Sequence, residues 1–291
     1  MICNYVLPNF DFHIANSAYT AEEFNESVDA SKTRRWSKWF LNFCWRSFKS
    51  PRVPFYERIF VNARGVDATH FSPDRRSDSV RGEILKQAGI PNDATVLLYS
   101  GRISPEKKIG LLVKMMKILA KDAERDYRLL IAGTGPQSEW LKTQGEKDAP
   151  GKIIQLGHLE KDPLADHYAN ADVFVHPNQR EPFGIAPLEA MASGVPTLAP
   201  NADGILTYAD NDNAWLVEPE PEAFAAAVRD IFSVENERPE KVGRALVTSR
   251  LYSWEASTAR LFALYDKLYL RFTADPDIYA YKETPEPIDF V

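Results

Sequence analysis

The stretch DVFVHPNQREPFGIAPLEAMASGVPTLAP, residues 172–200, predicts a strand, a helix and a second strand. Both strand candidates, 172–176 and 196–199, are short continuous apolar runs, which is typical of strands buried on both faces of a parallel sheet. Between them, Pro187 suits the first turn of a helix and Gly194 suits its C-terminal cap. A strand, a helix and a strand in this order indicate the α/β class.

The same alternation runs through the chain from residue 94 onward. Four further β-rich apolar runs are separated by helix-like segments such as 110–121, and they occupy residues 95–99, 128–132, 152–156 and 214–217. The pattern predicts one complete Rossmann-like domain, a parallel sheet with helices on both faces. Ligands of such sheets bind beyond the carboxyl ends of the strands, so we expect the site residues just after these runs.

The first 73 residues differ from this pattern. They hold two strand candidates, 12–15 and 58–61, separated by an acidic helix-like stretch and a basic, aromatic one. Because two strands cannot close an α/β domain, we expect residues 1–73 to be the remnant of a domain that begins upstream. We assign 74–255 to the complete domain, and 256–291 to a last helix and an acidic, proline-rich tail.

The amino-acid composition argues against several classes of protein. The 291 residues carry a net charge of −6, so the chain as a whole lacks the basic footprint of a nucleic-acid-binding protein. Cys3 and Cys44 are the two cysteines, too few for a disulfide framework. The start does not read as a signal peptide, and no run of about 18 apolar residues suggests a membrane span. We therefore expect a cytoplasmic location.

Two carboxylates flank a glycine after the strand candidate at 172–176. Glu181 is in the loop before the helix, Glu189 is within the helix, and Gly184 leaves backbone amides near the helix start open to an anion. This arrangement suits a ligand with both hydroxyls and phosphates. The alternative is that Glu181 and Glu189 are ordinary solvated charges.

A basic loop follows the strand candidate at 95–99. Gly101 permits a turn, and the cations Arg102, Lys107 and Lys108 follow it. Such a loop can hold a diphosphate without a metal, because arginine binds phosphate in a bidentate manner and lysine acts as a point charge. A solvated basic loop is the alternative.

Three other motifs carry less chemistry. The stretch GTGPQS, residues 133–138, imitates a dinucleotide fingerprint but lacks its third glycine, so we interpret it as a tight turn at the rim of the site. The triplets 210–212 and 275–277 have the D-x-D pattern, but they lie in a predicted turn and in the tail. The histidines form no ligand-spaced pair, so we predict no metal site.

Residues 32–52 form a basic, aromatic segment. It has seven basic residues, no acidic ones and six aromatics, with Trp36, Phe40 and Phe43 on one helical face. This helix either packs on its own domain, as amphipathic helices usually do, or lies on an anionic membrane surface. The second alternative would make the protein peripheral to a membrane.

Together the motifs resemble the retaining GT-B glycosyltransferases of family 4. The resemblance runs from about residue 11 to 270 and rests on four segments. These are NARGVD (62–67) with FSP (71–73), GR with Lys107 (101–107), EPFGIAPLEAMASGVP (181–196), and SWE (253–255). Its start corresponds to the late part of the family's first domain, which agrees with an N-terminal truncation.

The resemblance implies transfer of a sugar from a nucleoside diphosphate sugar, with UDP or GDP as the nucleotide, and with retention of the anomeric configuration. Arg102 and Lys107 would stabilise the departing diphosphate, while Glu181 would contact the sugar hydroxyls. Donor-binding roles are implied for the ribose partner Glu189 and for residues placed beside the phosphates, the sugar or the base: Gly101, Leu159, Phe183, Gly184 and Ile185. No cofactor besides the donor is implied, and the acceptor stays open.

Three departures from the family pattern matter. First, Lys108 replaces a usual glycine. Second, NADG at 201–204 replaces a Gly-Gly loop, and its Asp203 puts a negative charge near the expected diphosphate. Third, we expect the early part of the family's first domain, with its Gly-rich loop and sugar-facing histidine, to be missing from these 291 residues, because His13 does not match that histidine. The chain is therefore either a sugar-transferring enzyme or a module that binds nucleotide sugar without turnover.

Two other enzyme classes fit less well. The incomplete fingerprint at 133–138 disfavours an NAD-dependent oxidoreductase. A glycoside hydrolase with Glu181 and Glu189 as its acid and base would leave the basic loop unexplained.

Overall fold

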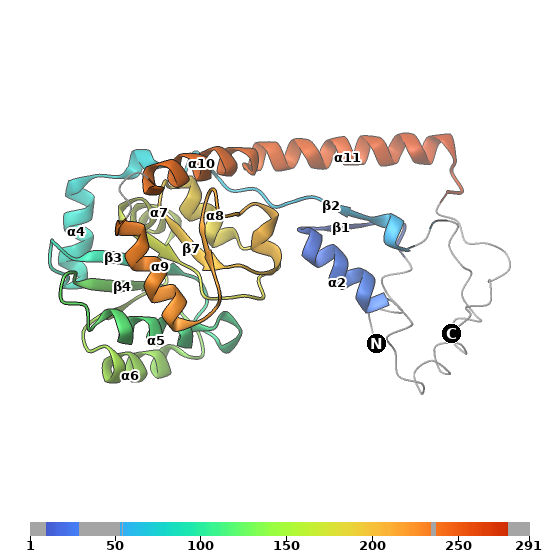
Figure 1. Cartoon of the computed structure of the whole chain (residues 1–291). Helices are drawn as coiled ribbons and strands as arrows, with labels where there is room; N and C mark the ends of the chain where they lie inside the picture. Colours follow the sequence, from blue (N-terminus) through green and yellow to red (C-terminus); the bar gives the residue numbers. More distant parts are fainter. Residues whose placement is uncertain (1–9, 29–52, 54, 234–236, 279–291) are drawn as a thin grey trace, which may run out of the picture. The chain divides into compact units, whose positions relative to one another are not determined.

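A computed structural model describes residues 10–28, 53, 55–233 and 237–278 of the chain (Figure 1). The chain divides into two compact units, one of Arg64–Ala256 and one of Met1–Ala63 with Ser257–Val291. The roles proposed above for 1–73, 74–255 and 256–291 stay predictions.

The Arg64–Ala256 unit is built on a six-stranded parallel sheet in the order β5-β4-β3-β6-β7-β8. Its strands are β3 (Thr95–Ser100), β4 (Tyr127–Ala132), β5 (Ile153–Gly157), β6 (Val173–Val175), β7 (Thr197–Pro200) and β8 (Trp215–Val217). All six predicted strands are confirmed, with ends within one residue. Most side chains of β3, β4, β6 and β7 are buried, as expected for strands covered on both faces.

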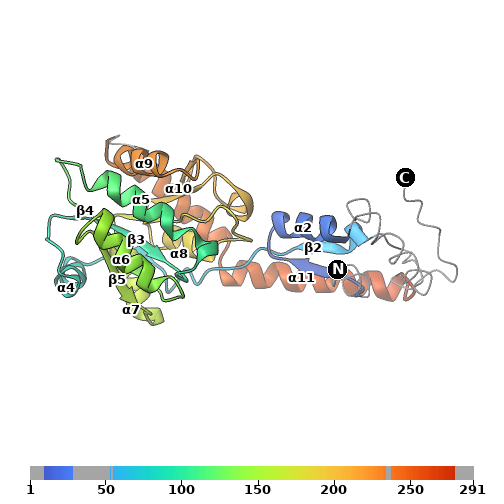
Figure 2. The same cartoon turned by 90° about the horizontal axis from the view of Figure 1, so that it is seen from below.

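Helices cover both faces of this sheet (Figures 1 and 2). On one face, α5 (Ile109–Leu119), α6 (Ser138–Asp148) and α9 (Pro221–Ser233) share a core with strand residues such as Leu97 and Leu129. The other helices of the unit are α4 (Asp78–Ala88), α7 (Lys161–Asn170), α8 (Ile185–Ala192) and α10 (Glu237–Leu251). Here α4 packs on α7, and α8 packs on both α7 and α10.

The strand order changes direction between β3 and β6. From β3 the chain adds β4 and β5 on one side, then crosses to β6 on the other side of β3 and adds β7 and β8. The connection after β3 leads to α5, whereas the connection after β6 leads to α8 on the opposite face. Neighbouring connections that leave in opposite directions open a crevice at the strand ends, which is the usual ligand site of such sheets.

The smaller unit holds two parallel strands and two helices in its described residues. Strand β1 (His13–Ala15) pairs with β2 (Ile59–Val61), which confirms both strands predicted in the first 73 residues. Helix α2 (Ala18–Val28) is the acidic stretch between them, and α11 (Trp254–Ala274) continues into this unit. Buried Arg58 donates to the Phe10 carbonyl at 2.6 Å, and Ser257 Oγ donates to the Ala63 carbonyl at 2.6 Å.

The basic, aromatic segment 32–52 lies outside the described residues. Its role at a membrane surface therefore stays a prediction. Among the described helices, none combines the length and the apolar composition needed to cross a membrane.

Two glycines after β4 allow the loops after β3 and β4 to touch. A Cβ at Gly133 would lie 2.0 Å from the Gly101 carbonyl oxygen, and one at Gly135 would lie 2.2 Å from the Ile103 carbonyl oxygen. Backbone bonds join the loops, from Ile103 N–H to the Thr134 carbonyl and from Gln137 N–H to the Ile103 carbonyl, each at 3.0 Å. The GTGPQS motif therefore fixes the position of the basic loop 101–108.

Gly133→Ala is expected to lower the free energy of unfolding by at least about 2 kcal/mol, because the new Cβ meets backbone and φ at this position is 144°. Urea unfolding followed by circular dichroism measures the change. Gly82→Ala is the control, since no atom lies within 4 Å of its added Cβ in α4, and it should stabilise by about 0.5–1 kcal/mol. Equal stability of the Gly133 variant and wild type would contradict this account.

Candidate functional site

An ion pair joins the two loops that leave the sheet at the crevice between β3 and β6. Lys107 ends the 3-10 helix Pro105–Lys107 in the loop after β3, and Glu181 lies in the loop after β6. Lys107 Nζ lies 2.8 Å from Glu181 Oε2 and 3.1 Å from Oε1. Because an ammonium group has three N–H donors, Lys107 keeps one donor for a further acceptor.

Glu181 is held by neighbours from its own loop as well. Asn178 Nδ2 donates to Glu181 Oε2 at 2.8 Å, and His176 Nε2 lies 3.5 Å from the same oxygen. Burial alone would raise the pKa of Glu181, but His176, Lys107 and Asn178 stabilise the carboxylate and bring its pKa to about 2. Glu181 is therefore a fixed negative charge at neutral pH.

Glu189 differs from Glu181 in its electrostatic environment. It lies in α8, and Tyr168 Oη from α7 donates to Glu189 Oε2 at 3.0 Å. Burial raises the pKa of Glu189 to about 7, and the bond from Tyr168 opposes this rise only in part. A half-buried carboxyl with one oxygen without a hydrogen bond in the described structure can accept hydroxyl groups of a ligand.

Gly184 has a backbone conformation that favours glycine. Its φ is 83°, it caps the N-terminus of α8, and an added Cβ would lie 3.0 Å from Ile205 and 3.1 Å from Tyr208 Oη. Tyr208 Oη donates to the Gly184 carbonyl, and the Tyr208 ring packs on buried Phe183 with centroids 5.1 Å apart. This packing fixes the backbone that leads from Glu181 into α8.

The remaining predicted site residues lie at the same edge of the sheet. Gly101 and exposed Arg102 directly follow β3, Ile185 begins α8, and half-buried Leu159 follows β5. Tyr99 Oη donates to the Arg102 carbonyl at 3.0 Å, which holds the backbone of the basic loop. The ligand contacts assigned to these four residues stay predictions.

Two departures from the family pattern share one backbone feature. Lys108 and Asp203 both have φ of 55°, and they are the non-glycine residues with positive φ in the described parts of the chain. Such a conformation is unfavourable for a residue with a Cβ, which explains why glycine is the easier choice there. Gly204, next to Asp203, donates its N–H to the Glu181 carbonyl at 3.0 Å.

The first D-x-D triplet is a turn, as predicted. Asp210 Oδ1 accepts N–H groups from Asp212 at 2.8 Å and from Asn213 at 3.2 Å. Within the described ranges, no cluster of three or more His, Cys, Asp or Glu side chains is arranged to hold a metal ion.

Three residues that contact or lie beside the two carboxylates were not predicted from the sequence. His176, Asn178 and Tyr168 surround the two carboxylates, and His176 is 3% exposed with neither ring nitrogen hydrogen-bonded within the described structure. His176 and Asn178 could have been suspected, because they follow directly on a strand end. Tyr168 gives no comparable pattern, since its distance from Glu189 depends on how α7 packs on α8.

A family model confirms the assignment. The model described as "Glycosyl transferases group 1" matches residues 80–245, which include both carboxylates and the basic loop. The chain belongs to this family. The relatives named below are glycosyltransferases, so the family to which this chain belongs is a family of enzymes.

Two relatives show the extent of the likeness in sequence. D-inositol 3-phosphate glycosyltransferase of Corynebacterium glutamicum is 30% identical over 220 residues, which cover 72% of this chain and 52% of that protein. A GDP-mannose-dependent alpha-(1-6)-phosphatidylinositol dimannoside mannosyltransferase of Mycobacterium tuberculosis is 32% identical over 203 residues, or 68% and 50%. The group 1 chain thus spans about half the length of these relatives.

The fold likeness extends further along the chain. Anabaena HepE, solved in complex with UDP and glucose, matches with a TM-score of 0.73 and 18% identity, over 91% of this chain and 66% of that one. This match and the parallel sheet confirm the predicted GT-B fold class.

Glu189→Gln is expected to gain stability relative to wild type as pH rises. The carboxyl titrates near 4.5 in the unfolded chain and near 7 in the folded one, so between these values the folded protein binds more protons and wild type loses stability as pH rises. The difference is at most about 3 kcal/mol and levels off above pH 7. Urea unfolding at pH 5, 6, 7 and 8 measures it.

Glu222→Gln, at an exposed position of α9, is the control for the loss of one carboxylate. A stability difference between Glu189→Gln and wild type that stays constant from pH 5 to 8 would contradict the raised pKa.

Proposed function

We propose that this group 1 glycosyltransferase binds a nucleoside diphosphate sugar, with UDP or GDP as the nucleotide, and transfers its sugar with retention of configuration. The proposal rests on one observation. A basic loop and two carboxyl groups with different pKa values, Glu181 and Glu189, follow strands at the same edge of the sheet. Lys107 and Arg102 supply cations for a diphosphate, and Glu181 and Glu189 supply acceptors for hydroxyls. The names of the relatives support the donor class, since one is GDP-mannose-dependent and one structure holds UDP and glucose.

Each carboxylate suits a different part of the donor. Glu181 stays ionised at neutral pH beside Lys107, so it fits a place near developing positive charge on the sugar ring. Glu189 has a pKa of about 7, and ribose hydroxyls that donate to it would favour its ionised form. We assign Glu181 to the sugar and Glu189 to the ribose.

The chemical step breaks the bond between the anomeric carbon and a phosphate oxygen and forms a bond from that carbon to an acceptor oxygen. The acceptor hydroxyl passes its proton to the departing diphosphate, so no side chain is assigned as a base. Lys107 and Arg102 stabilise the negative charge on that leaving group, an effect worth about 3 kcal/mol for a single contact at such a site.

A second candidate is a module that binds nucleotide sugar without turnover. Its support is the length of the chain, which covers only 52% and 50% of the two relatives. The residues of the nucleotide site lie in Arg64–Ala256, so binding requires less of the protein than transfer does.

Calorimetric titration of UDP and GDP tests the nucleotide site. Glu189→Ala and Arg102→Ala are each expected to weaken the better-bound nucleotide at least tenfold, about 1.4 kcal/mol, because each removes a charged ligand contact. Arg250→Ala in α10 is the matched control at an exposed arginine outside the crevice. Wild-type affinity in both site variants would rule out this assignment.

Transfer is tested with the same chain and a panel of nucleotide sugars, followed by proton NMR of the anomeric signal. Retention predicts that the product keeps the anomeric configuration of the donor. Lys107→Met should lower kcat about a hundredfold or more while nucleotide still binds. Inverted product would contradict retention, and nucleotide binding without any turnover would favour the binding module.

A further inference from the structure

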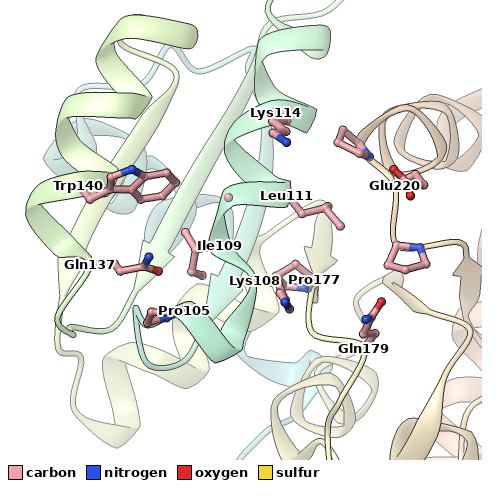
Figure 3. A pocket seen from close by; sticks show the side chains of 13 residues that line it. Pro105, Lys108, Ile109, Leu111, Lys114, Gln137, Trp140, Pro177, Gln179 and Glu220 are labelled. Atoms are coloured by element: carbon pink, nitrogen blue, oxygen red, sulfur yellow. The ribbon is translucent and has the colours of Figure 1, made fainter.

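A groove of about 550 Å³ lies in the Arg64–Ala256 unit (Figure 3). Four segments line it: the start of α5 with the 3-10 helix before it, the start of α6, the loop after β6, and the loop between β8 and α9. Its volume is in the range of small-molecule sites, about 300–1,000 Å³. None of its lining residues is among those assigned above to the nucleotide sugar.

Polar side chains from all four segments line this groove. Lys108 and Lys114 come from α5 and the residue before it, Gln137 precedes α6, Gln179 follows β6, and Glu220 precedes α9. Within the described residues, none of these five side chains makes a hydrogen bond or an ion pair. In Figure 3 Gln137 lies on one side of α5 and Gln179 and Glu220 lie on the other, and all five side chains line the same groove.

An aromatic side chain completes one wall. Trp140 in α6 is 41% exposed and lines the groove, and it lies across from α5 with its ring carbon Cη2 3.5 Å from the Cβ position of Gly110 (Figure 3). An exposed indole offers a flat apolar surface with a polar edge, which fits the C–H face of a pyranose ring. Carboxamides such as Gln137 and Gln179 can both donate to and accept from sugar hydroxyls.

The charge of the groove favours acidic saccharides over neutral ones. Two lysines and one glutamate line it, a local excess of one positive charge in a chain whose net charge is −6. The N-terminus of α5, where Lys108 is the N-cap, adds partial positive charge on the same side. Both features favour a ligand that carries a negative group.

Lys108 and Lys107 serve different sites. Lys107 points to Glu181 in the crevice, whereas Lys108, with φ of 55°, lines the groove. Glycine would adopt this backbone conformation without strain. We therefore infer that lysine occurs at position 108 because its side chain has a function there. The two adjacent cations, which read as one basic loop in the sequence, are divided between two sites.

We propose that this groove binds a saccharide carrying a carboxylate or a phosphate. Trp140 stacks on a sugar ring, Gln137 and Gln179 bind hydroxyls, and Lys108 and Lys114 bind the anionic group. None of the residues that line the groove is assigned to the nucleotide sugar, so the proposal does not depend on sugar transfer by this chain.

The test uses the full chain and four probes: trigalacturonate, a phosphorylated maltotriose, uncharged maltotriose and inorganic phosphate. Binding is followed through the indole N–H signal of Trp140 in nitrogen–proton NMR, assigned with Trp140→Phe. One or both acidic trisaccharides should shift this signal at concentrations at least tenfold below maltotriose. Binding of both would show that the groove accepts either a carboxylate or a phosphate. Binding of only one would identify which of the two acidic groups the groove accepts.

Three variants and one control locate the site. Trp140→Ala and Lys114→Ala should each weaken the acidic trisaccharide at least fivefold, while Lys121→Ala, an exposed lysine just after α5, should leave it unchanged. Lys108→Gly should weaken binding equally but keep or raise the unfolding midpoint, because it relieves the left-handed backbone. A lysine with a merely structural role would lower the midpoint on replacement.

Several outcomes would overturn the proposal. They are no probe binding, equal binding of charged and uncharged trisaccharides, phosphate alone binding as well as the saccharides, or displacement of the saccharide by saturating UDP. Failure of UDP and GDP to bind in calorimetry would count against the proposed transferase function only, so the two failures are distinguishable.

Discussion

The change of strand order between β3 and β6 is the constraint on which the site depends. It sends the connection after β3 to one face of the sheet and the connection after β6 to the other, which leaves a crevice at the strand ends. Lys107 and Glu181 meet across that crevice at 2.8 Å, with the carboxylate largely buried. Removing Lys107 would leave the partly desolvated carboxylate of Glu181 with only Asn178 and His176 beside it, which is costlier than losing one surface contact.

Close backbone contacts hold the two loops in place. Gly133 and Gly135 let the basic loop touch the turn after β4, and Gly204 lets the 201–204 loop touch the backbone of Glu181 and Pro182. A Cβ at any of the three would lie within 2.2 Å of a carbonyl oxygen. The positions of Lys107 and Glu181 therefore follow from backbone packing more than from their own side-chain contacts.

The pKa values of two glutamates eight residues apart, Glu181 and Glu189, are shifted in opposite directions. Glu181 has several polar neighbours and a pKa of about 2, whereas burial raises the pKa of Glu189 to about 7 against the hydrogen bond from Tyr168. In the sequence the two residues look like an equivalent pair. The difference arises because Glu181 lies in a loop that gathers His176 and Asn178, while Glu189 lies on a helix packed against α7.

The amino-acid pattern alone was enough to predict the six strands of the larger unit and to group the candidate site residues. Continuous apolar runs mark buried parallel strands, and such strands place their following loops at one edge, so Arg102, Lys107, Glu181 and Glu189 could be grouped from their positions in the chain. Which of these groups touch each other is settled by tertiary packing. The pairing of Lys107 with Glu181, the bond from Tyr168 to Glu189 and the turning of Lys108 into a separate groove depend on strand order and helix packing. These contacts link residues far apart in the chain, and no local pattern of residues encodes them.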